Sequence, residues 1–169
     1  MGDFCGVLRC PVLRGRSAGL CRKSRARGLF AETGKARADG LLPAGYDGMA
    51  GLGRYGWRTD PITGEEAFHR GTDLACSEGT LVLAAMDGVV TAARRSATYG
   101  NYLCLSHGGG QETLYAHLQY LFVRAGEVVQ AGQPLGTAGE TGRSTGAHLH
   151  FELLEQGVRY DAGALLGLP

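Results

Sequence analysis

The sequence has no apolar run close to the ~18 residues that cross a bilayer, so no transmembrane segment is predicted. Its first residues also lack a basic segment followed by a clean apolar stretch, because Arg9 interrupts the only candidate. We therefore predict no signal peptide, and the sequence does not indicate an export route. Proline is scarce, with five residues, which excludes a proline-rich linker.

Cysteine is sparse and irregularly placed. Three of the five cysteines lie near the N-terminus, and no regular spacing indicates a disulfide scaffold. A zinc site built from Cys5, Cys10 and Cys21 would need a fourth ligand and tighter pairing, so it is disfavoured. We expect Cys76 and Cys104 to be small residues of the core.

Glycine is abundant instead, with 29 residues scattered among short apolar runs. This pattern indicates many tight turns and predicts an all-β domain with little helix, an antiparallel sandwich or partly open barrel. Charge divides the chain, since residues 1–45 have a balance of +6 and the remainder −5. We predict a basic, poorly ordered arm over 1–45 and a folded domain over 46–169. Such an arm could touch nucleic acid, but a solvated arm is the simpler interpretation, so no nucleic-acid partner is expected.

Short apolar runs bounded by glycine turns predict the strands. They are Leu81–Ala85, Gly88–Ala93, Tyr102–Ser106, Glu112–His117 and Leu149–Leu154. The dipeptide Asp87-Gly88 is a strong hairpin signal, and the three glycines that begin at Gly108 predict a second turn. A short helix is possible at Ala162–Leu166.

The last of these runs, in TGAHLHFELL (Thr145–Leu154), holds two histidines two residues apart. Successive side chains of a strand point to opposite faces, so His148, His150 and Glu152 share one face while the apolar residues between them face the core. For one histidine, a half-exposed strand is the simplest interpretation. Two imidazoles on one pleat, however, can serve one site. Glu152 is expected to be exposed, although it could also support such a site.

Further candidate ligands lie upstream. His69 precedes Asp73 by four residues, and Gly71 between them disfavours a helix. In an irregular turn both side chains can still reach one ion, and imidazole nitrogen and carboxylate oxygen both suit zinc. His117 ends an apolar strand, whereas His107 stands at a strand–turn junction and is expected to be structural.

Together these motifs resemble the lysostaphin/LytM-type zinc metallopeptidases, a family of bacterial peptidoglycan endopeptidases. The family's ordered pattern is His-x-x-x-Asp, then a central His, then His-x-His. It is matched by His69 and Asp73, by His117, and by His148 and His150. The stretches YGWRTDP, YGNYLCLSHGGG, TLYAHL and GVRYDAG are also similar. The resemblance covers about residues 53–163.

This resemblance implies a lysostaphin-type fold and one zinc ion held by His69, Asp73 and His150. It implies that His117 and His148 are the catalytic pair, in a monomeric zinc metalloendopeptidase. The enzyme would hydrolyse peptide bonds of peptidoglycan, in stem peptides or cross-bridges, by a metal-activated water, in the cell envelope or outside the cell. Expected substrate contacts on the groove loops are Tyr99, Asn101, Tyr115, Ser144 and Thr145.

Two alternatives remain open at this point. The first is a LytM-like module that binds and regulates a separate cell-wall hydrolase; such modules typically lack some of the metal ligands or catalytic histidines, and here all five are present. The second is a lipoyl- or biotin-carrier-like hairpin over VRAGEVVQAGQPLG. That alternative is disfavoured because no lysine follows Lys35, so the hairpin has no residue to modify.

Overall fold

The computed structural model describes residues 51–166, so the predicted arm over 1–45 lies outside the described residues. The described part is almost entirely antiparallel β-structure, as predicted. The strands are β1 (Gly51–Gly53), β2 (Gly56–Thr59), β3 (Glu66–His69), β4 (Thr72–Ala75), β5 (Leu81–Leu83), β6 (Gly88–Ser96), β7 (Gly100–Gly108), β8 (Gln111–Leu121), β9 (Val128–Val129), β10 (Pro134–Ala138), β11 (His148–Glu155) and β12 (Val158–Tyr160). A short helix, α3 (Ala162–Leu166), follows them. Within 51–166, no helix is long and apolar enough to cross a membrane.

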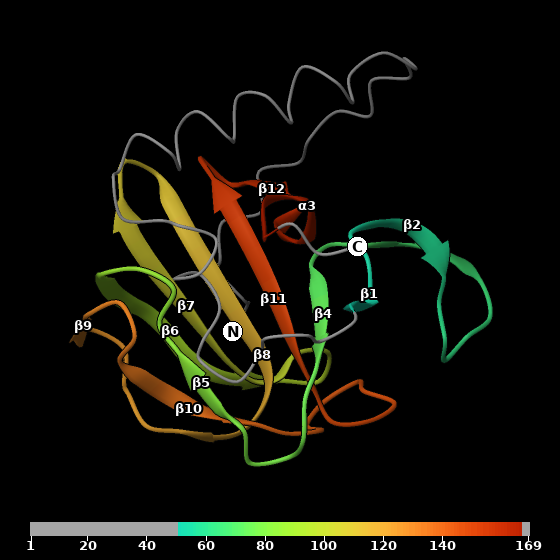
Figure 1. The fold of residues 1–169 in the computed structure, drawn as a ribbon, viewed down its shortest axis with the longest axis horizontal. Helices are drawn as coiled ribbons and strands as arrows, with labels where there is room; N and C mark the ends of the chain where they lie inside the picture. Colours follow the sequence, from blue (N-terminus) through green and yellow to red (C-terminus); the bar gives the residue numbers. More distant parts are fainter. Residues whose placement is uncertain (1–50, 167–169) are drawn as a thin grey trace.

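Ten of the strands form one sheet that does not close. Its main path runs β1-β4-β11-β8-β7-β6-β9, with β10 joined to β8 and β5, and β12 joined to β11 (Figure 1). Register irregularities interrupt the β6–β7, β7–β8 and β8–β10 pairs. Such bulges increase local twist and bend the strands, which lets the sheet curl around its own apolar face.

The core lies inside this curl and is built from alternate residues of most strands. Leu103 and Leu105 of β7, Phe151 and Leu153 of β11, and Tyr115 of β8 are at most 2% exposed. Their alternation with residues of the other face follows from the two-residue period of a strand. The opposite face of β8 carries a second, smaller apolar cluster of Leu114 and Ala116 with Cys104, whereas the opposite face of β11 carries the polar side chains of His148, His150 and Glu152.

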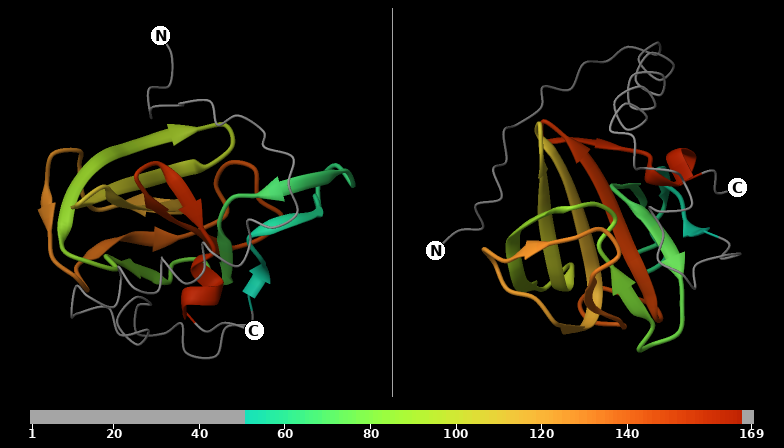
Figure 2. Two further views of the ribbon diagram at one scale, coloured as in Figure 1. Left: turned by 90° about the horizontal axis from the view of Figure 1, so that it is seen from above. Right: turned by 60° about the vertical axis from the view of Figure 1, so that its left-hand side comes forward.

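A separate two-stranded hairpin, β2–β3, stands beside the main sheet (Figure 2). Its aromatic residues lie on one face, where Trp57 contacts Phe68 edge-on across the strands and Phe68 also contacts Tyr55. This hairpin was not predicted, because its strands are short and carry their apolar residues on the exposed face. The hairpin positions a candidate site residue, because β3 ends at His69 and β4, which contains Asp73, begins three residues later.

The structure confirms two of the predicted local elements and contradicts a third. The glycine turn that begins at Gly108 joins β7 to β8 as a hairpin, as predicted. The prediction of a hairpin at Asp87-Gly88 is wrong, because β5 pairs with β10 while β6 pairs with β7 and β9. The short helix at Ala162–Leu166 is confirmed.

Candidate metal centre and cleft

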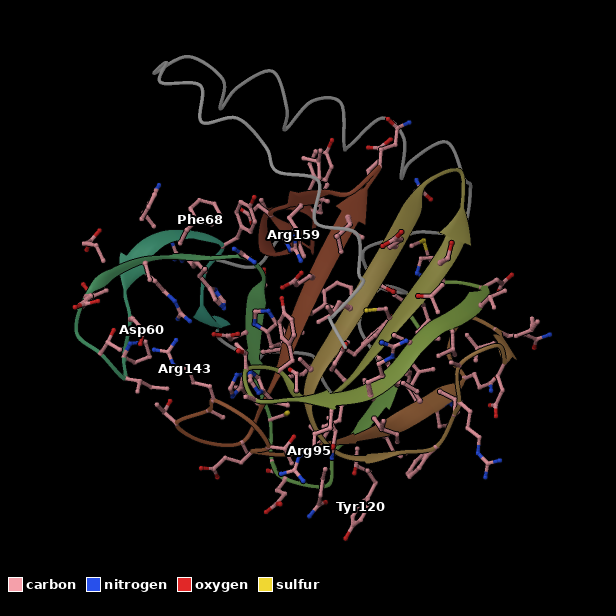
Figure 3. All side chains as sticks on the ribbon, turned by 180° about the vertical axis from the view of Figure 1, so that it is seen from behind. Asp60, Phe68, Arg95, Tyr120, Arg143 and Arg159 are labelled. Carbon is pink, nitrogen blue, oxygen red and sulfur yellow. The ribbon has the colours of Figure 1, made fainter. Side chains whose placement is uncertain are left out.

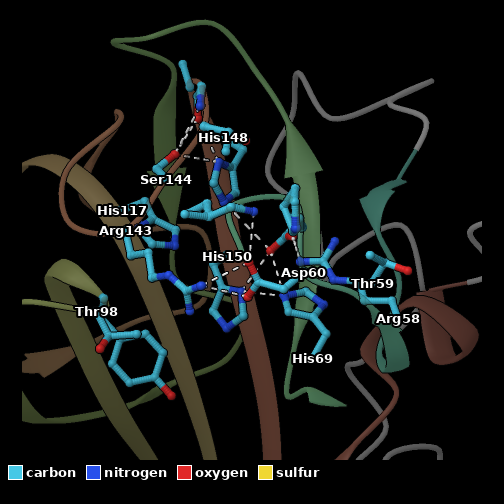
Figure 4. Close-up of a pocket in the computed structure, with 17 residues that line it drawn as sticks. Arg58, Thr59, Asp60, His69, Thr98, His117, Arg143, Ser144, His148 and His150 are labelled. Carbon is cyan, nitrogen blue, oxygen red and sulfur yellow. Dashed lines mark hydrogen bonds and ion pairs between the residues drawn. The ribbon is translucent and has the colours of Figure 1, made fainter. Parts of the chain in front are cut away.

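Three potential ligand atoms converge where β3, β4 and β11 meet. Asp73 Oδ1 lies 2.8 Å from His150 Nδ1 and 3.1 Å from His69 Nε2, and the two nitrogens are 3.1 Å apart (Figure 4). The antiparallel pairing of β4 with β11 sets His150 directly opposite Asp73. The turn at Gly71 then returns His69 to the same point, and the β-structure thus brings together residues 81 positions apart.

Gly71 is required by this turn. A Cβ atom at that position would lie 2.6 Å from the carbonyl oxygen of Phe151 and 2.8 Å from the ring of His150. Contacts this short displace backbone or ring, so any side chain would push β11 and the His150 imidazole out of place. The small residue between His69 and Asp73 therefore fixes how closely β4 and β11 approach.

The geometry fits a tetrahedral zinc ion. Ligands at about 2.0–2.1 Å from zinc lie roughly 3.3 Å apart, close to the separations of these three atoms. Each histidine is held by its other nitrogen. His69 Nδ1 donates to the carbonyl oxygen of Arg54 (2.9 Å), and His150 Nε2 donates to Glu152 Oε1 (3.2 Å). A carbonyl oxygen can only accept, so Nδ1 of His69 carries a proton and Nε2 is the nitrogen that can bind a cation.

Electrostatics at the three ligands also favour a cation. Burial lowers the pKa of His150, but hydrogen bonds from the ring to Asp73 and Glu152 outweigh it and raise the pKa to about 9. Burial likewise raises the pKa of Asp73, but hydrogen bonds from His150 and His69 outweigh it and hold the pKa far below its usual range. Without a metal, a proton on His150 thus occupies the point where a metal ion would bind, and metal binding would release it.

His117 and His148 lie beside the three ligands without completing the cluster. Their ring centroids are 4.6 Å apart, and His148 Nε2 is 3.7 Å from Asp73 Oδ1. His117 Nδ1 donates to the carbonyl oxygen of Thr141 (2.7 Å) and His148 Nδ1 to that of Gly146 (2.8 Å). Nδ1 of each ring is thus occupied, which leaves Nε2 for the cleft that both rings line.

The backbone of His117 is in the left-handed region, with φ of 61°. Non-glycine residues adopt this conformation rarely, and such residues cluster at functional sites. Burial lowers the pKa of its imidazole to about 4, so the ring is neutral at pH 7. The supporting Thr141 packs on Gly100, which has φ of 63° and where a Cβ atom would lie 2.3 Å from the Thr141 carbonyl.

The prediction that Glu152 is exposed is wrong, because its side chain is fully buried. Its Oε2 lies 2.5 Å from Arg159 Nε, and its Oε1 accepts hydrogen bonds from the Tyr99 hydroxyl (2.7 Å) and from His150. Burial raises the pKa of Glu152, but the hydrogen bond from His150 and the charge of Arg159 outweigh it and lower the pKa below its ordinary value. The carboxylate is buried under the side chains that it contacts, those of Tyr99, His150 and Arg159.

Of the predicted substrate contacts, the structure places three in the cleft and two elsewhere. Tyr99, Ser144 and Thr145 line a cleft of about 470 Å³ together with the histidines. Tyr115 faces the core instead, with 2% exposure, and its hydroxyl accepts a hydrogen bond from Ala85 N. The Asn101 amide donates to the Leu118 and Gln119 carbonyls, where it supports the irregular end of β8. Tyr115 is thus buried away from the cleft, and Asn101 is not among the residues that line it.

Three charged residues of the cleft were missed from the sequence. Arg58 Nη2 lies 3.0 Å from Asp73 Oδ2, and Arg143 Nη2 lies 2.9 Å from each carboxylate oxygen of Asp60. Arg58 and Asp60 belong to the YGWRTDP stretch quoted above for the resemblance, which was the available signal. Arg143 stands in a glycine-rich loop and carried no signal of its own.

His107 and the two cysteines of the domain lie apart from the cleft. Cys104 is buried and Cys76 packs against the main core, in agreement with the expectation that they are core residues. His107 Nδ1 donates to the Asp87 carbonyl (2.9 Å), and its Nε2 accepts from the Thr113 hydroxyl (2.7 Å). These contacts hold the ring as a neutral, structural histidine.

We therefore predict that His107 makes stability depend on pH. Burial lowers its folded-state pKa below the ordinary value of 6.5, so protonation favours the unfolded chain. The stability that neutral His107 provides is fully present above pH 6.5 and is lost as the pH falls below that value. The free energy of unfolding, measured between pH 8 and 5 for the wild type and His107→Asn, should fall more steeply for the wild type. Parallel curves would contradict the prediction.

A His, Asp and His donor set beside an open cleft is typical of mononuclear zinc hydrolases. The chain belongs to Peptidase family M23, whose family model matches residues 67–162. It is 46% identical over 101 residues to the peptidoglycan DD-endopeptidase ShyC of Vibrio cholerae, an alignment that covers 60% of this chain and 23% of that protein. The chain thus spans less than a quarter of the length of this relative.

Solved structures show the same fold. The catalytic domain of lysostaphin from Staphylococcus simulans superposes with a TM-score of 0.64 at 30% identity, covering 72% of this chain and 95% of that one. A zinc-containing peptidase from Vibrio cholerae superposes with a TM-score of 0.59 at 37% identity, covering 68% of this chain and 37% of that one. The lysostaphin-type architecture expected from the sequence is therefore confirmed.

Proposed function

We propose that this domain is a zinc-dependent endopeptidase that hydrolyses peptide bonds of bacterial peptidoglycan. The observation that carries the proposal is the convergence of His69, Asp73 and His150 within 3.1 Å of one another, beside His117 and His148 in an open cleft. The relatives support the substrate, because ShyC is named a peptidoglycan DD-endopeptidase. By the same similarity, we propose a bond of the peptide cross-links as the target and the cell envelope or its exterior as the location.

The residues of the cleft fit this reaction. Zinc held by the three ligands would polarise the scissile carbonyl and bring the pKa of water toward ~7. His117 presents a neutral Nε2 to the cleft and can accept a proton from the attacking water. His148 presents its Nε2 beside Asp73, where it can orient that water. The proton taken up by His117 can then return to the leaving amine, directly or by way of His148.

Arg58 and Glu152 support the ligands rather than the substrate. Arg58 binds Asp73 Oδ2, which directs Oδ1 toward the cluster. Glu152 holds His150 through Nε2, which directs Nδ1 toward the same point. The family resemblance gave Tyr99 a possible substrate role, but its hydroxyl is engaged by Glu152, so we assign its ring alone to the cleft wall.

The proposal is tested on the full chain by bound zinc and by the loss of turbidity of purified cell walls, with and without chelator. We expect about one zinc ion per chain and lysis that the chelator stops. His150→Ala should lose both zinc and lysis, and its retention of both would contradict the ligand assignment. Zinc without lysis of any wall type would instead favour the regulatory module. Absence of zinc would overturn the proposal.

A further inference from the structure

An ion pair spans the mouth of the cleft. Asp60 lies at the turn of the β2–β3 hairpin, and Arg143 lies on the loop between β10 and β11, 83 residues later. Figure 3 shows the two side chains meeting where the hairpin approaches that loop. Because the hairpin is not part of the main sheet, this contact ties its tip to the body of the domain.

Asp60 is a fixed anchor in this pair. Its Oδ1 accepts hydrogen bonds from the backbone N–H groups of Ile62 (2.8 Å) and Thr63 (3.1 Å), which hold the carboxylate in the turn. Its side chain is only 15% exposed. The carboxylate therefore keeps partners of its own if Arg143 is drawn elsewhere, and it orients Arg143 while the two are paired.

Arg143, in contrast, is only partly used. A single nitrogen, Nη2, donates to both oxygens of Asp60, and the other guanidinium N–H groups make no hydrogen bond within the described residues. Its side chain is 42% exposed and lines the cleft, while its backbone N–H is fixed to the Thr98 carbonyl. The second arginine of the cleft, Arg58, is already bound to Asp73. Arg143 is thus the cation that a bound peptide can reach.

The charges of the cleft make an anion its complementary ligand. Its lining contains two arginines and two aspartates, whose charges cancel, so a divalent cation at the three ligands would leave two positive charges. A guanidinium with free N–H groups binds a carboxylate more strongly than a neutral carbonyl.

We propose that Arg143 is a specificity-determining residue that binds a carboxylate of the peptide substrate, and that Asp60 positions it for this contact. Resting on the function proposed above, this assigns to the cleft a preference for peptides with a carboxylate near the scissile bond. Stem peptides carry such groups, whereas glycine bridges carry none between their ends. The substrate class is therefore the anionic stem peptide rather than the neutral bridge.

The test measures binding to the zinc-loaded full chain by calorimetry. The probes are one stem tetrapeptide with free carboxyl groups and the same peptide with every carboxyl group amidated. The wild type should bind the free peptide more tightly. Zinc itself attracts carboxylates, so the decisive quantity is the change in this preference between variants. Arg143→Gln should reduce the preference ~10-fold, the loss expected for one charged hydrogen-bonded contact.

Matched variants separate recognition from structure. Arg143→Lys should restore part of the preference because it keeps the charge, and Asp60→Asn should reduce it less than Arg143→Gln does. Arg95→Gln makes the same chemical change at an exposed arginine outside the cleft and should have no effect (Figure 3). Zinc content should stay constant throughout. A preference that Arg143→Gln leaves unchanged, or a wild type that binds both peptides equally, would overturn the proposal. Failure of the proposed enzyme activity would appear separately, as no cleavage of cross-linked peptides.

Discussion

His117→Ala and His148→Ala should each abolish most hydrolysis while zinc remains bound. Neither ring belongs to the cluster of three ligands, and both present Nε2 to the cleft with Nδ1 fixed by a backbone carbonyl. Removal of a positioned acid or base slows a reaction by about 10²–10⁴-fold. The rate of cross-link cleavage and the zinc content of each variant, measured on the same preparation, check this prediction.

The variants also decide between ligand and catalytic roles for His148, because its Nε2 lies only 3.7 Å from Asp73 Oδ1. His150→Ala provides the comparison, since it should lose zinc and activity together. If His148→Ala lost zinc to the same extent as His150→Ala, the division into ligands and catalytic residues would be incorrect.

Glu152→Ala should damage both stability and zinc affinity. The substitution leaves Arg159 without its carboxylate and His150 Nε2 without its acceptor, in a region where Glu152 itself is inaccessible to solvent. Loss of hydrogen bonds to a charged group costs about 1.5–3 kcal/mol, since the partly exposed Arg159 can turn to solvent, and loss of the carboxylate partner of a ligating histidine costs about 10–100-fold in metal affinity. Urea unfolding of the metal-free chain and competition with a zinc chelator measure the two effects.

Two further variants sharpen this result. Glu152→Gln retains an oxygen that can accept from His150 but not the charge that pairs with Arg159, so it should recover zinc affinity more than stability. Glu127→Ala removes an exposed carboxylate and should change stability by no more than about 0.5 kcal/mol. Equal effects at positions 127 and 152 would show that the Glu152 network does not support the domain.

The sequence was most informative where local chemistry decides the structure. Glycines at Gly108 and beyond specify a tight turn, so the β7–β8 hairpin was predictable. Asp87-Gly88 carries an equally strong local signal, but the two strands beside it do not pair with each other: β5 pairs with the distant β10, and β6 pairs with β7 and β9. Local turn preference cannot show which distant strand offers the better apolar face, and that choice overrode it here.

The candidate site, like the fold, was only partly predictable from local sequence. Spacing in the sequence, read through the resemblance, selected the five residues that the structure brings together in one cleft, although their roles remain predictions. The environment of Glu152 could not be deduced, because alternation along β11 says which face a residue occupies but not whether another layer covers it. Tyr115 was misjudged for a related reason: its place in β8 directs it to the core face. The Asp60–Arg143 pair joins segments that only tertiary structure brings together.

The pairing of β11 with β4 has a consequence for how the protein matures. Because Asp73 and His150 are 77 residues apart, the ligands cannot meet until this long-range pairing has formed. A slip of β11 by one residue would turn Leu149 and Phe151 toward the cleft and both histidines into the core. Metal binding would then add free energy only to the correctly registered sheet. A bound ion would thus stabilise only the chains whose strands are in the correct register. Chains with a slipped β11 would gain no such stability and would remain open to proteolysis.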